Sequence, residues 1–140
     1  MSAARIVTRR IYAPPAADDG YRVLIMRLWP RGIRKERADV WLKELGPIPA
    51  LLRDFLDDRI SWEQYVPRYL EGLARPEAQA AIDEVRRRTR EGRVTLLCGC
   101  ADEARCHRSL LRAYLLDSPR ARPRPSRARA ARRPARRRRA

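Results

Sequence analysis

The chain has 140 residues, of which 44% are hydrophobic, and a formal net charge of +16 at pH 7. This length suits one domain with a single core, and no apolar run is long enough to span a bilayer, so we expect no membrane association. The three cysteines lie too close together for the dispersed disulfide framework of a small secreted protein. We therefore predict a cytoplasmic protein with reduced thiols.

The positive charge is concentrated near the C-terminus. Residues 117–140 contain eleven arginines and one aspartate, a net charge of +10, whereas residues 1–116 contain 22 basic and 16 acidic residues, a net charge of +6. The C-terminal segment has no apolar periodicity, so we predict a disordered tail over 117–140 behind an α/β domain over 1–116. Such a tail can bind nucleic acid non-specifically. A compositionally biased extension without a function fits the segment equally well.

The domain begins with two predicted strands. Residues 5–12 are rich in β-branched side chains and are followed by two prolines, and residues 21–28 form a more apolar run that ends at Trp29-Pro30-Arg31-Gly32. From Glu36 the spacing of apolar residues becomes that of a helix, which closes at Gly46-Pro47.

Four further helices and a third strand complete the predicted domain. Apolar periods and capping signals predict helices over residues 49–56, 61–73, 76–91 and about 105–116. The apolar run over 94–98 predicts a buried strand. Strands at both ends of a helical middle predict an α/β fold with a small, largely parallel sheet covered by helices.

Several short motifs point to one family. The sequence Arg27-Leu28-Trp29-Pro30-Arg31-Gly32 is followed by Trp41 to Leu45, Arg68-Tyr69 and Val94 to Leu97. Together they resemble the YeaO-like family of domains of unknown function, over about residues 5–116. The resemblance implies a compact cytosolic α/β domain and brings no established activity.

Two positions depart from that family pattern. Met26 stands where members often have an aspartate, and Gly72 stands where they tend to have a glutamate. The sequence Cys106-His107-Arg108 resembles one branch of the family. Because other members lack these cysteines, a function shared by the whole family could not depend on them.

All three cysteines and the only histidine fall within ten positions, at Cys98, Cys100, Cys106 and His107. Thiolates act as nucleophiles, imidazoles as bases and guanidinium groups as anion clamps. Cys98 and Cys100 follow a buried strand, and parallel α/β sheets bind ligands at the carboxyl ends of their strands. A helix that begins beside them would favour an anion and lower a thiol pKa. The cluster therefore predicts a functional site.

The first interpretation of this site is thiol chemistry on a small anionic ligand, in a pocket between residues 29–32 and residues 98–108. Cys98 or Cys100 is then the nucleophile, and His107 is the base or orienting residue. The predicted catalytic residues are Cys98, Cys100, His107 and Arg108. The predicted substrate-binding residues are Arg27, Trp29, Arg31, Gly32 and Cys106.

Three other interpretations stay open. We expect no cofactor if the site performs thiol chemistry. A structural zinc is the alternative, because four possible ligands are present at Cys98, Cys100, Cys106 and His107. Their spacing differs from the Cys-x2-Cys of zinc knuckles. The protein could instead be a non-catalytic module that binds nucleic acid through its tail. Finally, His107 shares a helical face with apolar residues, and cysteines can pack as small apolar side chains, so the cluster could belong to the core.

Overall fold

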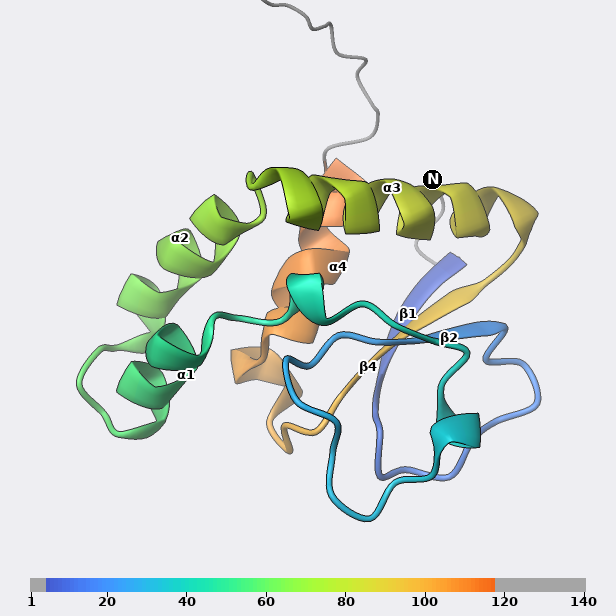
Figure 1. Cartoon of the computed structure of the whole chain (residues 1–140), viewed down its shortest axis with the longest axis horizontal. Coiled ribbons are helices and arrows are strands. Elements are labelled where there is room, and N and C mark those ends of the chain that lie inside the picture. Colours follow the sequence, from blue (N-terminus) through green and yellow to red (C-terminus); the bar gives the residue numbers. More distant parts are fainter. Residues whose placement is uncertain (1–4, 118–140) are drawn as a thin grey trace, which may run out of the picture.

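A four-stranded parallel sheet forms the centre of the protein, whose structure is a computed structural model that describes residues 5–117 (Figure 1). The strands are β1 (Ile6–Arg10), β2 (Tyr21–Leu24), β3 (Val40–Trp41) and β4 (Val94–Cys98). Their order in the sheet is β1-β4-β2-β3, so β4 lies in the interior although it is the last strand in the chain. All pairs are parallel, which brings the carboxyl ends of the strands to one edge. The predicted α/β fold class is confirmed.

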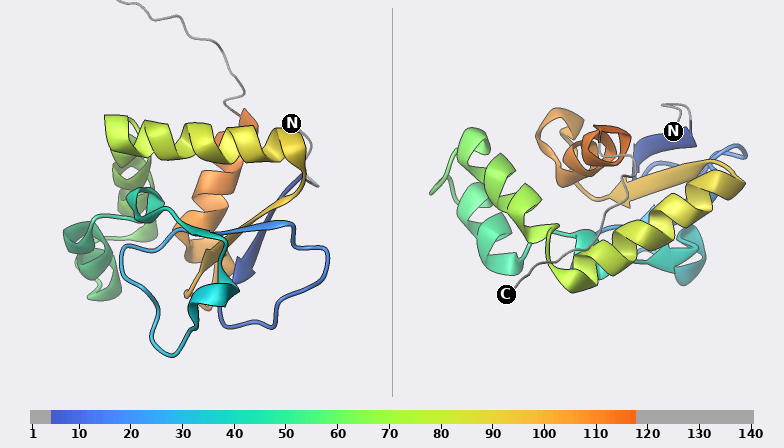
Figure 2. Two further views of the ribbon diagram at one scale, coloured as in Figure 1. Left: turned by 45° about the vertical axis from the view of Figure 1, so that its right-hand side comes forward. Right: turned by 90° about the horizontal axis from the view of Figure 1, so that it is seen from above.

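Helices pack on one face of this sheet (Figure 2). In the described part they are α1 (Pro49–Leu56), α2 (Trp62–Gly72), α3 (Pro76–Glu91) and α4 (His107–Asp117). Val94 and Leu96 of β4 share a buried apolar cluster with one or more side chains from every helix, among them Leu51, Tyr69, Ile82 and Leu111. Burial of this apolar surface is the main stabilising contribution to the fold. A proline at the start of α1 and of α3, and a capping box of Ser61 and Gln64 before α2, explain where these helices begin.

Loops rather than helices cover the other face of the sheet. Leu24 and Leu97 point to this side, where they pack with Ile11 and with the partly buried side chains of Trp29 and Ile33. Because successive residues of a strand alternate between faces, Leu97 lies under the loops while its neighbours Leu96 and Cys98 lie under the helices. The strand therefore delivers Cys98 to the helical side.

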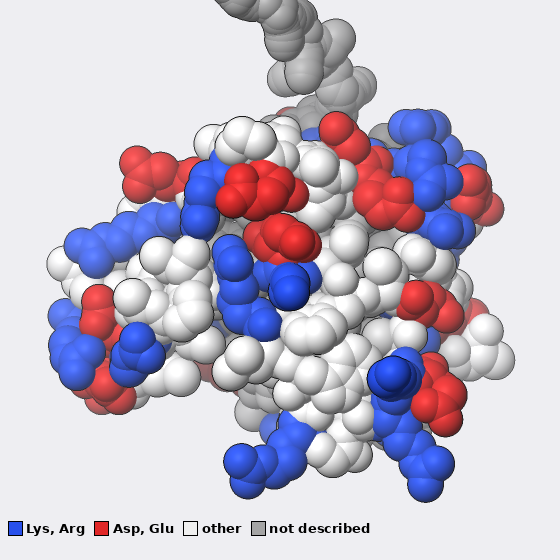
Figure 3. All heavy atoms as spheres, viewed as in Figure 1, with Lys and Arg blue, Asp and Glu red and all other residues white. Residues whose placement is uncertain are grey.

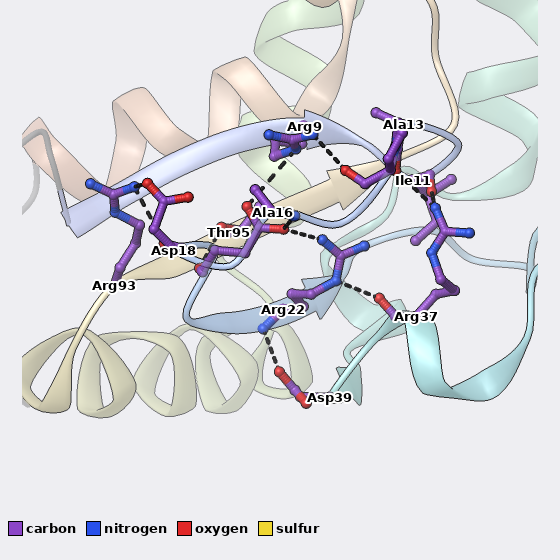
Figure 4. A network of polar contacts seen from close by, with 12 residues as sticks. Arg9, Ile11, Ala13, Ala16, Asp18, Arg22, Arg37, Asp39, Arg93 and Thr95 are labelled. Carbon is purple, nitrogen blue, oxygen red and sulfur yellow. Dashed lines mark hydrogen bonds and ion pairs between the residues drawn. The ribbon is translucent and has the colours of Figure 1, made fainter.

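A buried polar network ties these loops to the sheet (Figure 4). The Arg22 side chain pairs with the Asp19 carboxylate and donates from Nε to the Arg37 carbonyl at 2.6 Å. The backbone N–H of Arg22 donates to Asp39 at 2.8 Å, and the Thr95 hydroxyl donates to the Asp19 carbonyl at 2.6 Å. The network satisfies polar groups that the loops would otherwise bury without partners.

The predicted helix from Glu36 to Gly46 is wrong. Two 3-10 turns, η2 (Lys35–Arg37) and η3 (Lys43–Leu45), enclose β3 in this segment. Residues 40–41 pair with the edge of β2, and the Trp41 indole donates to the Met26 carbonyl at 2.6 Å. The first two strands are also shorter than predicted, because their outer residues turn into the loops.

The predicted division of the chain at residue 116 stays a prediction. α4 ends at Asp117, and the rest of the predicted tail, residues 118–140, lies outside the described residues. Among residues 5–117, no helix has the length and apolar character needed to cross a membrane.

Candidate functional site

Three thiols converge on the turn that follows β4. Cys98 ends this strand and is buried, Cys100 is half-buried two residues later, and Cys106 is buried directly before α4. A short 3-10 turn, η4 (Glu103–Arg105), reverses the chain between them. The three Sγ atoms lie within 4.8 Å of one another, and Cys98 donates a hydrogen bond to Cys100 over 3.7 Å.

His107 joins this cluster from the first residue of α4 and is buried. Its Nε2 lies 2.6 Å from the carbonyl oxygen of Ile25. A carbonyl can only accept, so Nε2 carries the proton and Nδ1 is the unprotonated nitrogen. Nδ1 lies 3.8 Å from Cys98 Sγ and 3.9 Å from Cys106 Sγ. The imidazole therefore presents its lone pair to two of the three thiols.

The thiols differ in acidity because they share hydrogen bonds. Hydrogen bonds from Cys106 and Cys98 lower the pKa of Cys100 well below the ordinary thiol value. Donation to Cys100 raises the pKa of Cys98 to about 11, and the same interaction raises the pKa of Cys106. Burial lowers the pKa of His107, so its ring is neutral at pH 7. Negative charge in the cluster is therefore directed to Cys100.

Arg108 holds the cysteine turn in position. Its Nη1 donates to the Cys100 carbonyl at 2.9 Å and to the Cys98 carbonyl at 3.5 Å. The residue is only 3% exposed and does not line the pocket beside the cysteines. Arg108 thus contacts both ends of the turn that carries Cys98 and Cys100, and its predicted catalytic role stays a prediction.

A pocket of about 300 Å³ opens beside the cluster. Its apolar wall comes from α1 and from the start of α2, with Leu52, Phe55, Leu56 and Tyr65. Its polar side comes from the turn and the start of α4, with Cys100, Asp102, Arg105, Cys106 and His107. Cys100 thus has a side facing solvent-accessible space as well as a side facing the other two thiols.

Arg27 lies in a different pocket from the cysteines. This pocket has a volume of about 460 Å³ and is formed by α1, α2 and the Gly46-Pro47 turn. The guanidinium donates from Nε to the Gly46 carbonyl at 3.1 Å. A role of Arg27 in substrate binding stays a prediction.

Trp29, Arg31 and Gly32 belong to a turn on the loop-covered side of the sheet. The Trp29 indole donates to the Ile33 carbonyl at 2.7 Å, and its ring meets that of Trp41 edge to face at 5.5 Å. Gly32 has a φ of +80°, which closes the turn. The structure brings together the four predicted catalytic residues and Cys106, but none of these three lines the cysteine pocket.

Sequence reasoning missed most of the pocket wall. Phe55 and Tyr65 lie within two of the predicted helices, and nothing in the sequence indicates that these helices lie beside the end of β4. Their rings lie 5.1 Å apart and close the pocket on that side. Arg105 could have been found, because it directly precedes Cys106-His107 in the sequence.

The fold and the site together define a small parallel α/β domain with a cluster of three cysteines and a histidine at the carboxyl edge of its sheet. The chain belongs to the family described as the active DUF488-N3 subclade, which it matches over residues 6–119. The YeaO-like resemblance seen in the sequence is confirmed.

The names of several similar proteins state no function. One from Mycobacterium tuberculosis and one from Mycobacterium bovis are each 33% identical over 113 residues, which cover 79% of this chain and 93% of the relative. The uncharacterised protein YeaO of Escherichia coli is 38% identical over 76 residues, which cover 53% of this chain and 66% of YeaO. No solved structure matches the chain.

Proposed function

We propose that the protein is a cytosolic enzyme that uses Cys100 as a nucleophile on a small substrate with an apolar body and an acidic group. The observation that carries this proposal is the pocket itself, which exposes Cys100 beside a neutral histidine at the carboxyl edge of the sheet. Its volume of about 300 Å³ is at the small end of ligand sites.

Each polar group of the pocket has a role in this proposal. The Cys100 sulfur forms a bond to the electrophilic atom of the substrate as the leaving group departs. Cys100 attacks as a thiolate, which the hydrogen bond from Cys98 stabilises, and His107 Nδ1 faces the sulfurs of Cys98 and Cys106. Arg105 binds the acidic group at the mouth of the pocket. Arg108 keeps the turn in place through its two carbonyl contacts.

Alkylation of the reduced full-length chain at pH 7 tests the nucleophile. We expect iodoacetamide to modify Cys100 first, because Cys98 and Cys106 are only 2% and 1% exposed. Peptide mapping by mass spectrometry identifies the modified residue. C100S should lose the fast phase of alkylation and C98S should keep it. Equal rates at the three thiols would contradict the assignment.

The anion site is tested by the charge of the reagent. Iodoacetate carries a carboxylate and iodoacetamide does not, so a cationic pocket raises the ratio of their rates at Cys100. We expect R105Q to lower this ratio by about fivefold, the effect of one exposed charged hydrogen bond. Arg53→Gln, on the neighbouring helix outside the pocket, is the matched control and should leave the ratio unchanged.

We also propose that the arginine-rich segment over 117–140 binds nucleic acid without reading its sequence. The observation in favour is its net charge of +10, in a chain whose residues 1–116 carry only +6. Basic and acidic side chains are interspersed on the face of the domain shown in Figure 3. Counterion release by arginines is sufficient for such binding.

A further inference from the structure

We propose that Cys98, Cys100, Cys106 and His107 form a binding site for one Zn²⁺ ion, which would control access to the nucleophile. The three Sγ atoms and His107 Nδ1 are the ligand atoms. The inference deepens the proposed function, because metal and substrate would compete for Cys100. The binding itself does not depend on that function.

The spacing of the sulfurs fits a tetrahedral ion. Zinc binds thiolates at about 2.3 Å, so two sulfurs on one tetrahedral ion lie about 3.8 Å apart. Cys98 and Cys100 are already 3.7 Å apart, and all three Sγ atoms lie within 4.8 Å of one another. The upper bound of 4.8 Å places Cys106 Sγ within about 1 Å of the tetrahedral separation from both other sulfurs.

His107 Nδ1 lies near the separation expected of a fourth ligand from two of the three sulfurs. A sulfur and a nitrogen on one tetrahedral zinc lie about 3.6 Å apart, for bonds of about 2.3 and 2.05 Å. His107 Nδ1 lies 3.8 Å from Cys98 Sγ and 3.9 Å from Cys106 Sγ. The nitrogen therefore has nearly the separation of a fellow ligand from two of the sulfurs. The set within 4.8 Å of one another contains the three sulfurs alone, so a side chain must move for Nδ1 and Cys100 to bind the same ion.

The histidine also has the surroundings of a metal ligand. Histidines that bind metals usually donate their second ring N–H to a carboxylate or backbone carbonyl, which fixes the tautomer and the ring orientation. His107 donates from Nε2 to the Ile25 carbonyl at 2.6 Å, so Nδ1 is free to bind. The Tyr69 ring packs 5.5 Å from the imidazole and limits its rotation.

Local backbone conformation explains how adjacent residues can share one ion. Two neighbours on an α-helix point about 100° apart and converge poorly. Cys106 is not on the helix: it has extended torsion angles, with φ −139° and ψ 143°, and α4 begins only at His107. The change from extended to helical backbone turns the Cys106 thiol and the His107 ring toward the same point.

The surroundings can accept the charge of the complex. Binding releases the remaining thiol protons, so Zn²⁺ with three thiolates and one neutral imidazole has a net charge of −1. The buried guanidinium of Arg108 contacts the Cys98 and Cys100 carbonyls and offsets this charge. Its Nε is buried without a hydrogen-bond partner. The pocket lined by Cys100 and Cys106 connects the site with solvent.

Zinc bound at this site would inhibit the thiol chemistry reversibly. Coordination to Zn²⁺ would withdraw negative charge from the Cys100 sulfur and make it a weaker nucleophile, so the protein would be less active with zinc than without it. Soft thiolate and imidazole ligands favour Zn²⁺ over Mg²⁺ or Ca²⁺.

Cobalt and zinc binding to the reduced, metal-free, full-length chain test the proposal. We expect one equivalent of Co²⁺ per chain, with thiolate-to-metal charge-transfer absorption and the intense visible bands of a tetrahedral ion. Zn²⁺ should displace it. C100S and C106S should each weaken zinc binding by about 100-fold or more, as expected for the loss of one of four ligands. D102N, in the same pocket, is the control and should keep the affinity within about threefold. Circular dichroism shows whether each variant is folded.

Two readouts separate this inference from the proposed function. If Co²⁺ gives no charge-transfer band and zinc is not retained, the metal site is overturned, whatever the reactivity of Cys100. If zinc binds and slows alkylation of Cys100 by about tenfold or more, the competition is supported. Zinc binding to a protein whose metal-free Cys100 reacts no faster than Cys98 would support the metal site and overturn the nucleophile.

Discussion

Asp19 and Arg22 are charged side chains that lie inside the domain, with 4% and 8% of their surfaces exposed. Their ion pair belongs to the network that holds the loops on one face of the sheet. Removal of one partner from a buried pair leaves the other charge without compensation, which costs more than the pair contributes. The stability of the fold should therefore depend strongly on the charges of Asp19 and Arg22.

We predict that Asp19→Ala lowers the free energy of unfolding by about 3–5 kcal/mol. The matched control is Asp54→Ala, which removes an exposed ion pair with Arg59 at 2.8 Å and should cost less than about 1 kcal/mol. Urea denaturation followed by circular dichroism measures both losses. Equal losses of the free energy of unfolding in the two variants would show that the buried Asp19 network does not stabilise the fold more than an exposed ion pair does.

For single residues, the sequence indicated which side chains lie together at the site. It did not indicate the hydrogen-bond partners of these side chains. Clustering of Cys98, Cys100, Cys106 and His107 was visible in the spacing, and the structure brings their side chains together. The partner of His107 is the carbonyl of Ile25, 82 positions earlier in the chain. Backbone carbonyls have no sequence signature, so neither this contact nor the hydrogen bonds from Arg108 to the Cys98 and Cys100 carbonyls could be predicted.

The turn before β2 shows how one residue sets the position of an element. Gly20 has a φ of +70°, and a Cβ at this position would lie 2.2 Å from the Arg93 carbonyl oxygen. The same oxygen accepts the backbone N–H of Tyr21 at 2.9 Å, the contact that aligns β2 with the start of β4. Only glycine allows both the torsion angle and the close approach.

We predict that Gly20→Ala lowers the free energy of unfolding by about 3 kcal/mol or more, because strain and a backbone clash add together. Gly32→Ala provides the control: its φ is +80°, but no atom lies within 4 Å of the added Cβ, so the torsional cost of about 1 kcal/mol stands alone. Chemical denaturation of both variants gives the comparison. An equal loss in the two would contradict the role of the clash at Gly20.

Elements with strong local signals were predicted well, and elements determined by pairing were not. α2 begins at its capping box, and α1 and α3 begin at prolines, all of which are encoded within a few residues. The segment from Glu36 to Leu45 has helical apolar spacing but no side-chain cap at Arg34 or Leu42. Pairing of Val40 with Val23 overrides this weak local preference.

For the whole molecule, the order of the strands in the sheet could not be predicted from the sequence. Parallel strands and helical connections indicate the class of fold, but the insertion of β4 between β1 and β2 depends on contacts across the entire chain. This order decides which loops cover which face. It places α1 beside the cysteine pocket and separates the turn of Trp29 from it, although the sequence analysis predicted that residues 29–32 border this pocket.

At the scale of the whole molecule, the net charge of +10 on residues 117–140 leads to a prediction about nucleic-acid binding. We expect full-length protein to bind two unrelated DNA duplexes with equal affinity, and log K to fall steeply with log salt concentration. Replacement of the eleven arginines in 117–140 by glutamine should reduce this slope by several units. Fluorescence anisotropy over a range of salt concentrations measures it. An unchanged slope would assign the binding to the domain instead.

The interior place of β4 also bears on how the protein is made. Neither β1 nor β2 has a neighbour on its inner side until residues 94–98 arrive, and these leave the ribosome near the end of translation of the domain. Until then β1 has no partner in the sheet and β2 pairs only with the two residues of β3. The segment that completes the sheet also brings Cys98, with Cys100 two residues behind it. Completion of the sheet and placement of the first thiol therefore depend on the same five residues.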